Sequence, residues 1–368
     1  MRGLWKVGAA TTCAVALSAF FLAIGAMPER AQAGAPAPPP PPSPAPSVSS
    51  PPTYFDTAVA SQSACANNAV FALERLSRAA DVPARNSGPA VWAAPCGTIG
   101  DIDDEGGVNG HDFDAVGGAA GLDLMIVGDM LAGLFVGYAD SETDVDNENS
   151  RLRTDSYFGG VYAGGTWGAG ALGEGFLDAL LTAGYQDHDS RRSLTPVGGA
   201  GHASADYDGY TLGGRLTLGS RMPLDSIELT PSLGLDVVSV HTDDFTENGG
   251  GGANQIVEDE TTTSVRGSIG LALSRTFQAD DTVIMPEARA RYVRELNDDS
   301  QQLSVATTGA PGTVSRLNSP EVDRDSVSLG AGLGVRVTPR FGLRLDYSAL
   351  LNADQTIHGL WAGGRLSW

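Results

Sequence analysis

Residues 326–338 read SVSLGAGLGVRVT, and this stretch decides the fold. From Val327 onward, apolar side chains stand at every second position and alternate with Ser, Gly and Arg336. A period of two is typical of a β-strand with one apolar face and one small or polar face. The stretch is also long enough for a tilted transmembrane strand, which needs about ten residues.

The same period recurs along the chain beyond residue 90, with Gly-rich turns between the segments. A soluble β-sandwich would also alternate, but it would not need so many long strands in one series. The sequence therefore predicts an all-β membrane protein, a 12-stranded antiparallel transmembrane β-barrel. The expected strands are 91–97, 114–126, 130–140, 155–167, 175–187, 207–221, 228–242, 262–276, 282–295, 326–338, 341–351 and 357–368.

The connections between these strands alternate in length. Those after even-numbered strands are short, as at 127–129 and 339–340, whereas most of the others are long and acidic, as at 141–154 and 243–261. Short periplasmic turns and long external loops are typical of outer-membrane barrels. We therefore expect the barrel in the outer membrane of a Gram-negative bacterium, with its loops extracellular.

Composition limits the function classes. The 368-residue chain has a formal net charge of −21, 42% hydrophobic residues and 48 Gly. This apolar content excludes a disordered chain, and Pro clustering excludes a collagen-like repeat. The acidic balance argues against nucleic acid as a partner.

The N-terminus predicts export. Arg2 and Lys6 precede an apolar run over 7–27, and Ala31-Gln32-Ala33 offers a signal peptidase site, so residues 1–33 are interpreted as a cleaved signal peptide. An uncleaved membrane anchor is the alternative. Residues 34–53 are Pro-rich and predict an extended polyproline spacer or stalk.

Within the linker 54–85, residues 54–80 change to Ala-rich helix formers that end before Pro83. At about 1.5 Å per residue, such a helix would reach roughly 40 Å, enough to cross a barrel lengthwise. Polar residues interrupt it too often for a transmembrane helix. We therefore predict a helix in the lumen, followed by the barrel at 86–368.

The order signal peptide, spacer, helix and twelve-stranded barrel resembles an autotransporter β-domain. Val91-Trp92 opens the barrel, and Trp368 closes it with a terminal aromatic residue. Similar pieces are GLD at 121–123, GLFVGY at 133–138 and GGVYAG at 159–164. The resemblance rests on the order of these short, degenerate motifs.

The resemblance implies a helix that threads the lumen and an N-terminal passenger carried outward, with Trp368 as a membrane assembly signal. It also implies the barrel assembly machinery and periplasmic chaperones as partners, beside the lipid bilayer. About twenty residues, mostly Pro, stand where this family usually carries a passenger of hundreds. We therefore expect a translocator that exports or displays its own short N-terminal segment. The alternatives are a helix-plugged, porin-like pore and a structural or adhesive surface protein acting through its acidic loops.

If apolar neighbours face lipid, a set of charged side chains faces the lumen. We expect a basic lumen in which the arginines pair with carboxylates, with water or with the helix. This charge network either binds the plug helix or merely holds the shape of the barrel. Its predicted members are Arg215, Arg266, Glu287, Arg289, Arg291, Arg336, Arg344, Asp346 and Arg365, with Asp178 and Asp236 as further acidic partners.

Two features of the helix could carry chemistry. Cys65 would lie on the helix and Cys96 in the first strand, so they either form a disulfide that ties helix to wall or remain two separate thiols. Asn67-Asn68 is similar to the self-cleaving pair of some autotransporters, in which the amide of the first Asn attacks its own carbonyl carbon. The simpler interpretation is two polar residues on a solvated helix face.

The sequence predicts no enzyme, cofactor or metal site. The five His residues are scattered without metal-ligand spacing. His188 lies between Asp187 and Asp189, and His241 precedes Asp243, so Asp/His pairs at the barrel rim could activate water. Acid-rich loops produce such neighbours by composition alone, and we expect no catalysis from them.

Overall fold

The computed structural model describes residues 72, 89–104, 109–127, 130–146, 149–170, 173–280, 282–297, 302–318 and 323–368. The predicted signal peptide, the spacer and every residue of the predicted helix except Ala72 lie outside this part. In the part of the chain that the structure describes, no helix is long and apolar enough to cross a membrane.

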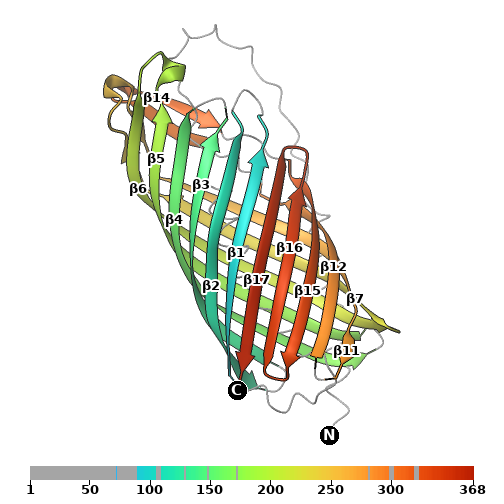
Figure 1. The fold of residues 1–368 in the computed structure, drawn as a ribbon. Helices are drawn as coiled ribbons and strands as arrows, with labels where there is room; N and C mark the ends of the chain where they lie inside the picture. Colours follow the sequence, from blue (N-terminus) through green and yellow to red (C-terminus); the bar gives the residue numbers. More distant parts are fainter. Residues whose placement is uncertain are drawn as a thin grey trace. The chain divides into compact units, whose positions relative to one another are not determined.

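Twelve strands form a closed antiparallel barrel, which confirms the predicted fold (Figure 1). Each strand pairs with its neighbour in sequence, as expected where hairpins connect consecutive strands. The strands are β1 (Ala90–Ile102), β2 (His111–Val127), β3 (Met130–Val145), β4 (Ser150–Gly170), β5 (Gly173–Ser193), β6 (His202–Leu224), β7 (Ile227–Thr242), β10 (Glu260–Ser274), β12 (Thr282–Glu295), β15 (Asp325–Thr338), β16 (Phe341–Leu351) and β17 (Gln355–Ser367).

The two ends of the barrel differ. At the turn end, where the chain terminates, Ala90 of β1 pairs with Ser367 of β17 (Figure 1). The exposed side chain of Trp368 lies at this end, and its backbone N–H donates to the Pro89 carbonyl oxygen at 3.4 Å. At the opposite loop end lie all the long connections. The predicted alternation of short turns and long loops is therefore present in part, since the loop-end connections 146–149 and 352–354 are short.

The outward face carries an apolar band that ends at a row of tyrosines. Leu134, Val161 and Leu181 are among its exposed aliphatic residues. Toward the loop end follow four tyrosines in register and then four aspartates in register: Tyr138, Tyr157, Tyr185 and Tyr210, and Asp140, Asp155, Asp187 and Asp208. Tyrosines at the edge of an apolar band are typical of the interface girdle of membrane barrels.

The strands β1–β6 are longer than predicted, and β4–β6 exceed the prediction most. β4 and β5 have 21 residues each and β6 has 23, and most of the predicted loop 141–154 belongs to β3 and β4. Beyond the tyrosine row the alternation continues, with small polar residues such as Thr143 inside and charged residues such as Arg153 outside. Because both faces are polar there, a prediction from the alternation of apolar and polar residues places the strand ends too early.

The two longest acidic loops form a small sheet that the sequence did not predict. Its strands pair in the order β14 (Ala310–Asn318), β13 (Gln302–Thr307), β9 (Gln255–Val257) and β8 (Phe245–Thr246). The remaining short elements are η1 (Thr195–Val197), η2 (Gly251–Ala253) and β11 (Phe277–Ala279).

The loop sheet is fixed to the barrel wall by a small core of its own. Tyr207 of β6 stacks on Phe245 at 4.2 Å between ring centroids. Arg192 of β5 donates to Glu247 at 2.8 and 2.5 Å, and both side chains are buried. A buried, bidentate ion pair fixes the relative position of its two side chains, so the loop between β7 and β10 is held against the barrel wall. The loop between β12 and β15 is held in turn by the pairing of β13 with β9.

A buried hydrogen-bond network ties the closing seam together. Arg365 of β17 donates through Nε to Asp123 of β2 at 2.6 Å, reaching over β1, which lies between these strands. The hydroxyl of Tyr162 on β4 also donates to Asp123, and the indole N–H of Trp92 donates to that hydroxyl at 2.9 Å. All four side chains are at most 7% exposed. Gly133 leaves room for the Tyr162 ring, since a Cβ there would collide with it.

We expect Arg365→Ala to destabilise the closed barrel by about 3–5 kcal/mol, because it leaves Asp123 buried without its cation. The temperature at which the folded band disappears in semi-native SDS gel electrophoresis measures the effect. Arg340→Ala, at an exposed turn position, is the matched control. Equal midpoints for the two variants would show that the seam network contributes nothing to closure.

Candidate functional site

The inner wall over β1–β5 and β17 carries an apolar cluster. Trp92 and Phe135 lie 6.2 Å apart between ring centroids, and Phe135 and Tyr162 lie 6.3 Å apart. Gly121 makes room for this packing, because a Cβ there would lie 2.6 Å from the Trp92 ring. The barrel residues of the cluster are Trp92, Ala94, Ala119, Leu131, Phe135, Ala139, Phe158, Tyr162, Leu180 and Trp361.

Ala72 belongs to the same cluster. It is helical, and only 4% of its surface is exposed. Ala72 precedes Ala90, the first residue of β1, by 18 positions, so chain from before the barrel packs against the inner wall. The remainder of the predicted lumen helix, with Asn67 and Asn68, lies outside the described residues.

Cys96 faces inward from β1 and packs against this cluster. It is disulfide-bonded. Its partner does not lie among the described residues, in which Cys96 is the one cysteine.

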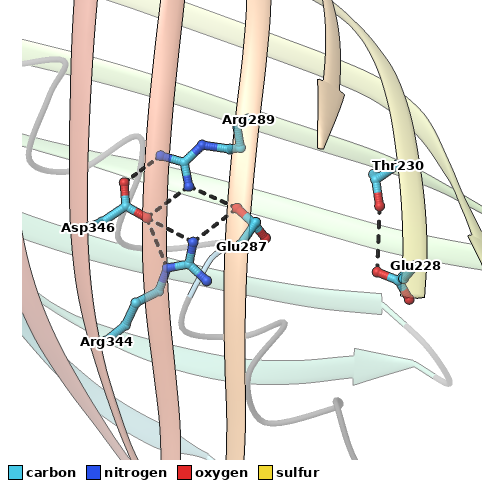
Figure 2. A network of polar contacts seen from close by, with 6 residues as sticks. All are labelled: Glu228, Thr230, Glu287, Arg289, Arg344 and Asp346. Carbon is cyan, nitrogen blue, oxygen red and sulfur yellow. Dashed lines mark hydrogen bonds and ion pairs between the residues drawn. The ribbon is translucent and has the colours of Figure 1, made fainter. Parts of the chain in front are cut away.

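Beside this cluster, where Asp346 of β16 stands opposite Trp361 of β17, the side chains of Glu287, Arg289, Arg344 and Asp346 form a quartet (Figure 2). Arg289 of β12 donates to Glu287 at 2.8 Å and to Asp346 of β16 at 2.8 Å. Arg344 donates to Glu287 at 3.0 Å and to Asp346 at 2.8 Å. Each carboxylate thus meets both guanidinium groups, which offsets the cost of burying four charges.

The quartet depends on the Gly positions of β15, the strand between β12 and β16. Glu287 and Asp346 both stand opposite Gly332. A Cβ at Gly332 would lie 2.6 Å from an Asp346 carboxylate oxygen, and one at Gly330 would lie 2.7 Å from Arg289. The Gly residues in SLGAGLGVRV therefore leave the space in which side chains of β12 and β16 meet.

The other predicted charged residues also lie on the inner wall. Arg215 pairs with Asp236 on the neighbouring strand, and Arg266 donates to Glu295 at 3.2 Å. Arg291 follows Arg289 on the inner face of β12, and Arg336 of β15 is 5% exposed. Carboxylates thus stand against most of these arginines, and the inner wall is ion-paired where the sequence suggested a basic lumen.

Several partners were missed by sequence reasoning. Asp123 and Glu295 each accept from a predicted arginine, and the inward Phe135 stands between two outward aliphatic residues. The rule that apolar residues face lipid concealed the apolar cluster. The usable signal was the presence of Gly at 121 and 160, next to the aromatic rings that need the space.

The rim dyad around His188 does not form. His188 points inward and is buried, with Nδ1 2.9 Å from the Thr154 hydroxyl, whereas Asp187 and Asp189 are exposed on the outer face. His241 pairs with Asp243 at 3.2 Å on the surface. Among the described residues, no group of three or more His, Cys, Asp or Glu side chains could hold a metal ion.

Comparison with known proteins identifies the family. The Autotransporter beta-domain family profile matches residues 91–348. The chain is 25% identical over 294 residues to an extracellular serine protease of Serratia marcescens, covering 79% of this chain and 27% of that protein. It is 27% identical over 234 residues to the esterase EstA of Pseudomonas aeruginosa, covering 61% of this chain and 34% of that protein.

Among solved structures, the translocator domain of the autotransporter NalP from Neisseria meningitidis superposes with a TM-score of 0.60 at 22% identity, covering 81% of this chain and 94% of that domain. The chain thus spans about a third or less of the two curated relatives but nearly all of a translocator domain. The barrel lies in the outer membrane of a Gram-negative bacterium, with its loops extracellular. The chain belongs to the autotransporter β-domain family.

Proposed function

We propose that this barrel carries its own N-terminal segment, residues 34–71, to the cell surface and then holds the linker helix in the lumen. One observation carries the proposal: Ala72 is helical and buried against the inner wall. A segment that precedes Ala72 and shares its helix starts inside the barrel, so the lumen is its path to the loop end.

The two-sided inner wall suits such a helix. Ala72 packs on the apolar cluster of β1–β5, while ion pairs line the wall over β6–β16. A helix with one Ala-rich stripe and one charged stripe is complementary to both. Glu74, two positions after Ala72, would lie away from the Ala72 face of the predicted helix and supply its charged side.

We propose Cys65 as the disulfide partner of Cys96. Cys65 precedes Ala72 by seven positions, which is close to two helical turns, so in the predicted helix the two residues would share one face. Ala72 and Cys96 both pack on the apolar cluster. A bond at this point would tie the helix to the wall once export is complete.

Mass spectrometry of protein extracted from outer membranes, without reductant, is expected to give an N-terminus at Gly34 and a peptide linking Cys65 to Cys96. Cys65→Ser should release a free Cys96 thiol to labelling, whereas Cys13→Ser, in the predicted signal peptide, should not. An N-terminus at Asn68 would instead assign self-cleavage to Asn67. A Cys96 bond to any other cysteine would contradict the pairing.

A helix-plugged pore is the second candidate, since Ala72 also occupies part of the lumen. In planar bilayers, the full chain is expected to conduct weakly and a chain lacking residues 54–80 to conduct strongly. Deleting residues 34–53 alone is the matched control and should leave the conductance low. Strong, anion-preferring conductance of the full chain would contradict the proposal that the helix occupies the lumen.

A surface assay separates display from a plug. Protease added to intact cells should remove an epitope placed in residues 34–53 and leave the barrel whole. The same epitope after Trp368, at the turn end, should stay protected until the outer membrane is opened. Protection of both epitopes would contradict export of the segment.

A further inference from the structure

Three neutral polar side chains line one part of the inner wall without a hydrogen-bond partner among the described residues. They are Ser156 of β4, Gln186 of β5 and Thr211 of β6. Ser156 and Gln186 are 0% exposed and Thr211 is 2% exposed. We call these three residues the polar niche.

The niche is a contiguous patch. Ser156 stands opposite Gln186, and Gln186 stands opposite Gly209, two positions before Thr211 on β6. A Cβ at Gly209 would lie 3.0 Å from His188 Nε2 and 3.2 Å from Gln186 Oε1, so Gly at this position lets both side chains approach the β6 backbone closely. Toward the loop end, the His188 ring is hydrogen-bonded to the Thr154 hydroxyl and stacks on Tyr207. These contacts hold the side chains of β4, β5 and β6 together just beyond the niche.

Burying such groups without partners is costly. A lost partner costs about 1–3 kcal/mol for each buried polar group. The charged groups of the quartet, and Arg215 with Asp236, are ion-paired on the same wall. Three unpaired groups side by side therefore indicate a site that receives its partner from something inside the lumen.

The chemistry of the niche selects the partner. An amide and two hydroxyls offer donors and acceptors but no charge. The inner cations nearest along the same strands, Arg215 and Arg192, already bind Asp236 and Glu247, so no free cation would hold a phosphate or carboxylate. Neutral donors and acceptors on adjacent strands match the N–H and C=O groups of an extended peptide.

The location selects which peptide. Phe158 and Leu180 belong to the cluster that holds Ala72, and the niche follows them toward the loop end on β4 and β5. Chain that leaves Ala72 toward the loop end passes this level. Resting on the proposed function, we propose that Ser156, Gln186 and Thr211 bind the extended backbone of this chain's own residues 34–64 while they pass outward.

The test uses the full chain in cells. The variants Ser156→Ala, Gln186→Leu and Thr211→Val, alone and together, remove hydrogen-bonding capacity with little change in volume. Pulse-labelled cells report the rate at which an epitope in residues 34–53 reaches external protease, and semi-native gels report barrel assembly. Thr98→Val on the inner face of β1 is the matched control.

We expect the triple variant to assemble normally and to slow surface arrival at least threefold, with smaller effects for single variants and none for Thr98→Val. Normal assembly with an unchanged rate would overturn the niche as a peptide site and leave it as a water site. If the triple variant fails to assemble, the single variants decide in the same way.

Cross-linking tests contact directly. A photoreactive phenylalanine analogue at Phe55 should link, during the pulse, to peptides of β4, β5 or β6. Links confined to β12–β16 would overturn the niche while supporting export through the lumen. An epitope that never reaches the surface in the wild-type chain would overturn the export proposal itself.

Discussion

The whole structure depends on pairing backbone N–H and C=O groups where no water is available to bind them. Inside a bilayer, a sheet satisfies this requirement only when its first strand meets its last. Here β1 meets β17 along eleven paired positions, and β10 meets β12 on the far side. Because closure satisfies the backbone, the side chains determine the properties of the two faces. The outer face contacts lipid, and the inner face lines a confined space.

That confined space is divided. Rings and small residues cover the wall over β1–β5, and ion pairs cover the wall from β6 to β16. A purely charged lumen would favour water and ions, and a purely apolar one would collapse or bind lipid-like ligands. A wall with both properties favours a peptide that has both, which is why the buried position of Ala72 carries functional weight.

The sequence alone predicts the barrel because strict alternation, as in SVSLGAGLGVRVT, indicates a β-strand with one apolar face, and many such long strands follow one another along the chain. It also predicts that Arg344 and Asp346 face inward, since parity along a strand decides this. It cannot say that Arg344 meets Glu287, because contact across β15 depends on register and on the space left by Gly332.

Two other features escaped prediction for physical reasons. The ends of β4–β6 were missed because polar residues occupy both faces beyond the tyrosine row, so hydropathy loses its period. The inward position of Phe135 was missed because an apolar residue between two apolar neighbours shows no alternation. In both cases the neighbouring strand supplies the missing information.

The unequal length of the strands shapes the exit of the lumen. On one side, β5, β6 and the loop sheet reach higher at the loop end than β16 and β17, which are joined by only residues 352–354 (Figure 1). A chain emerging at the loop end would therefore stay beside protein for longer next to β4–β6 than next to β16 and β17. Among the described residues, the barrel rim is thus uneven, and its low side is the seam at which β1 meets β17.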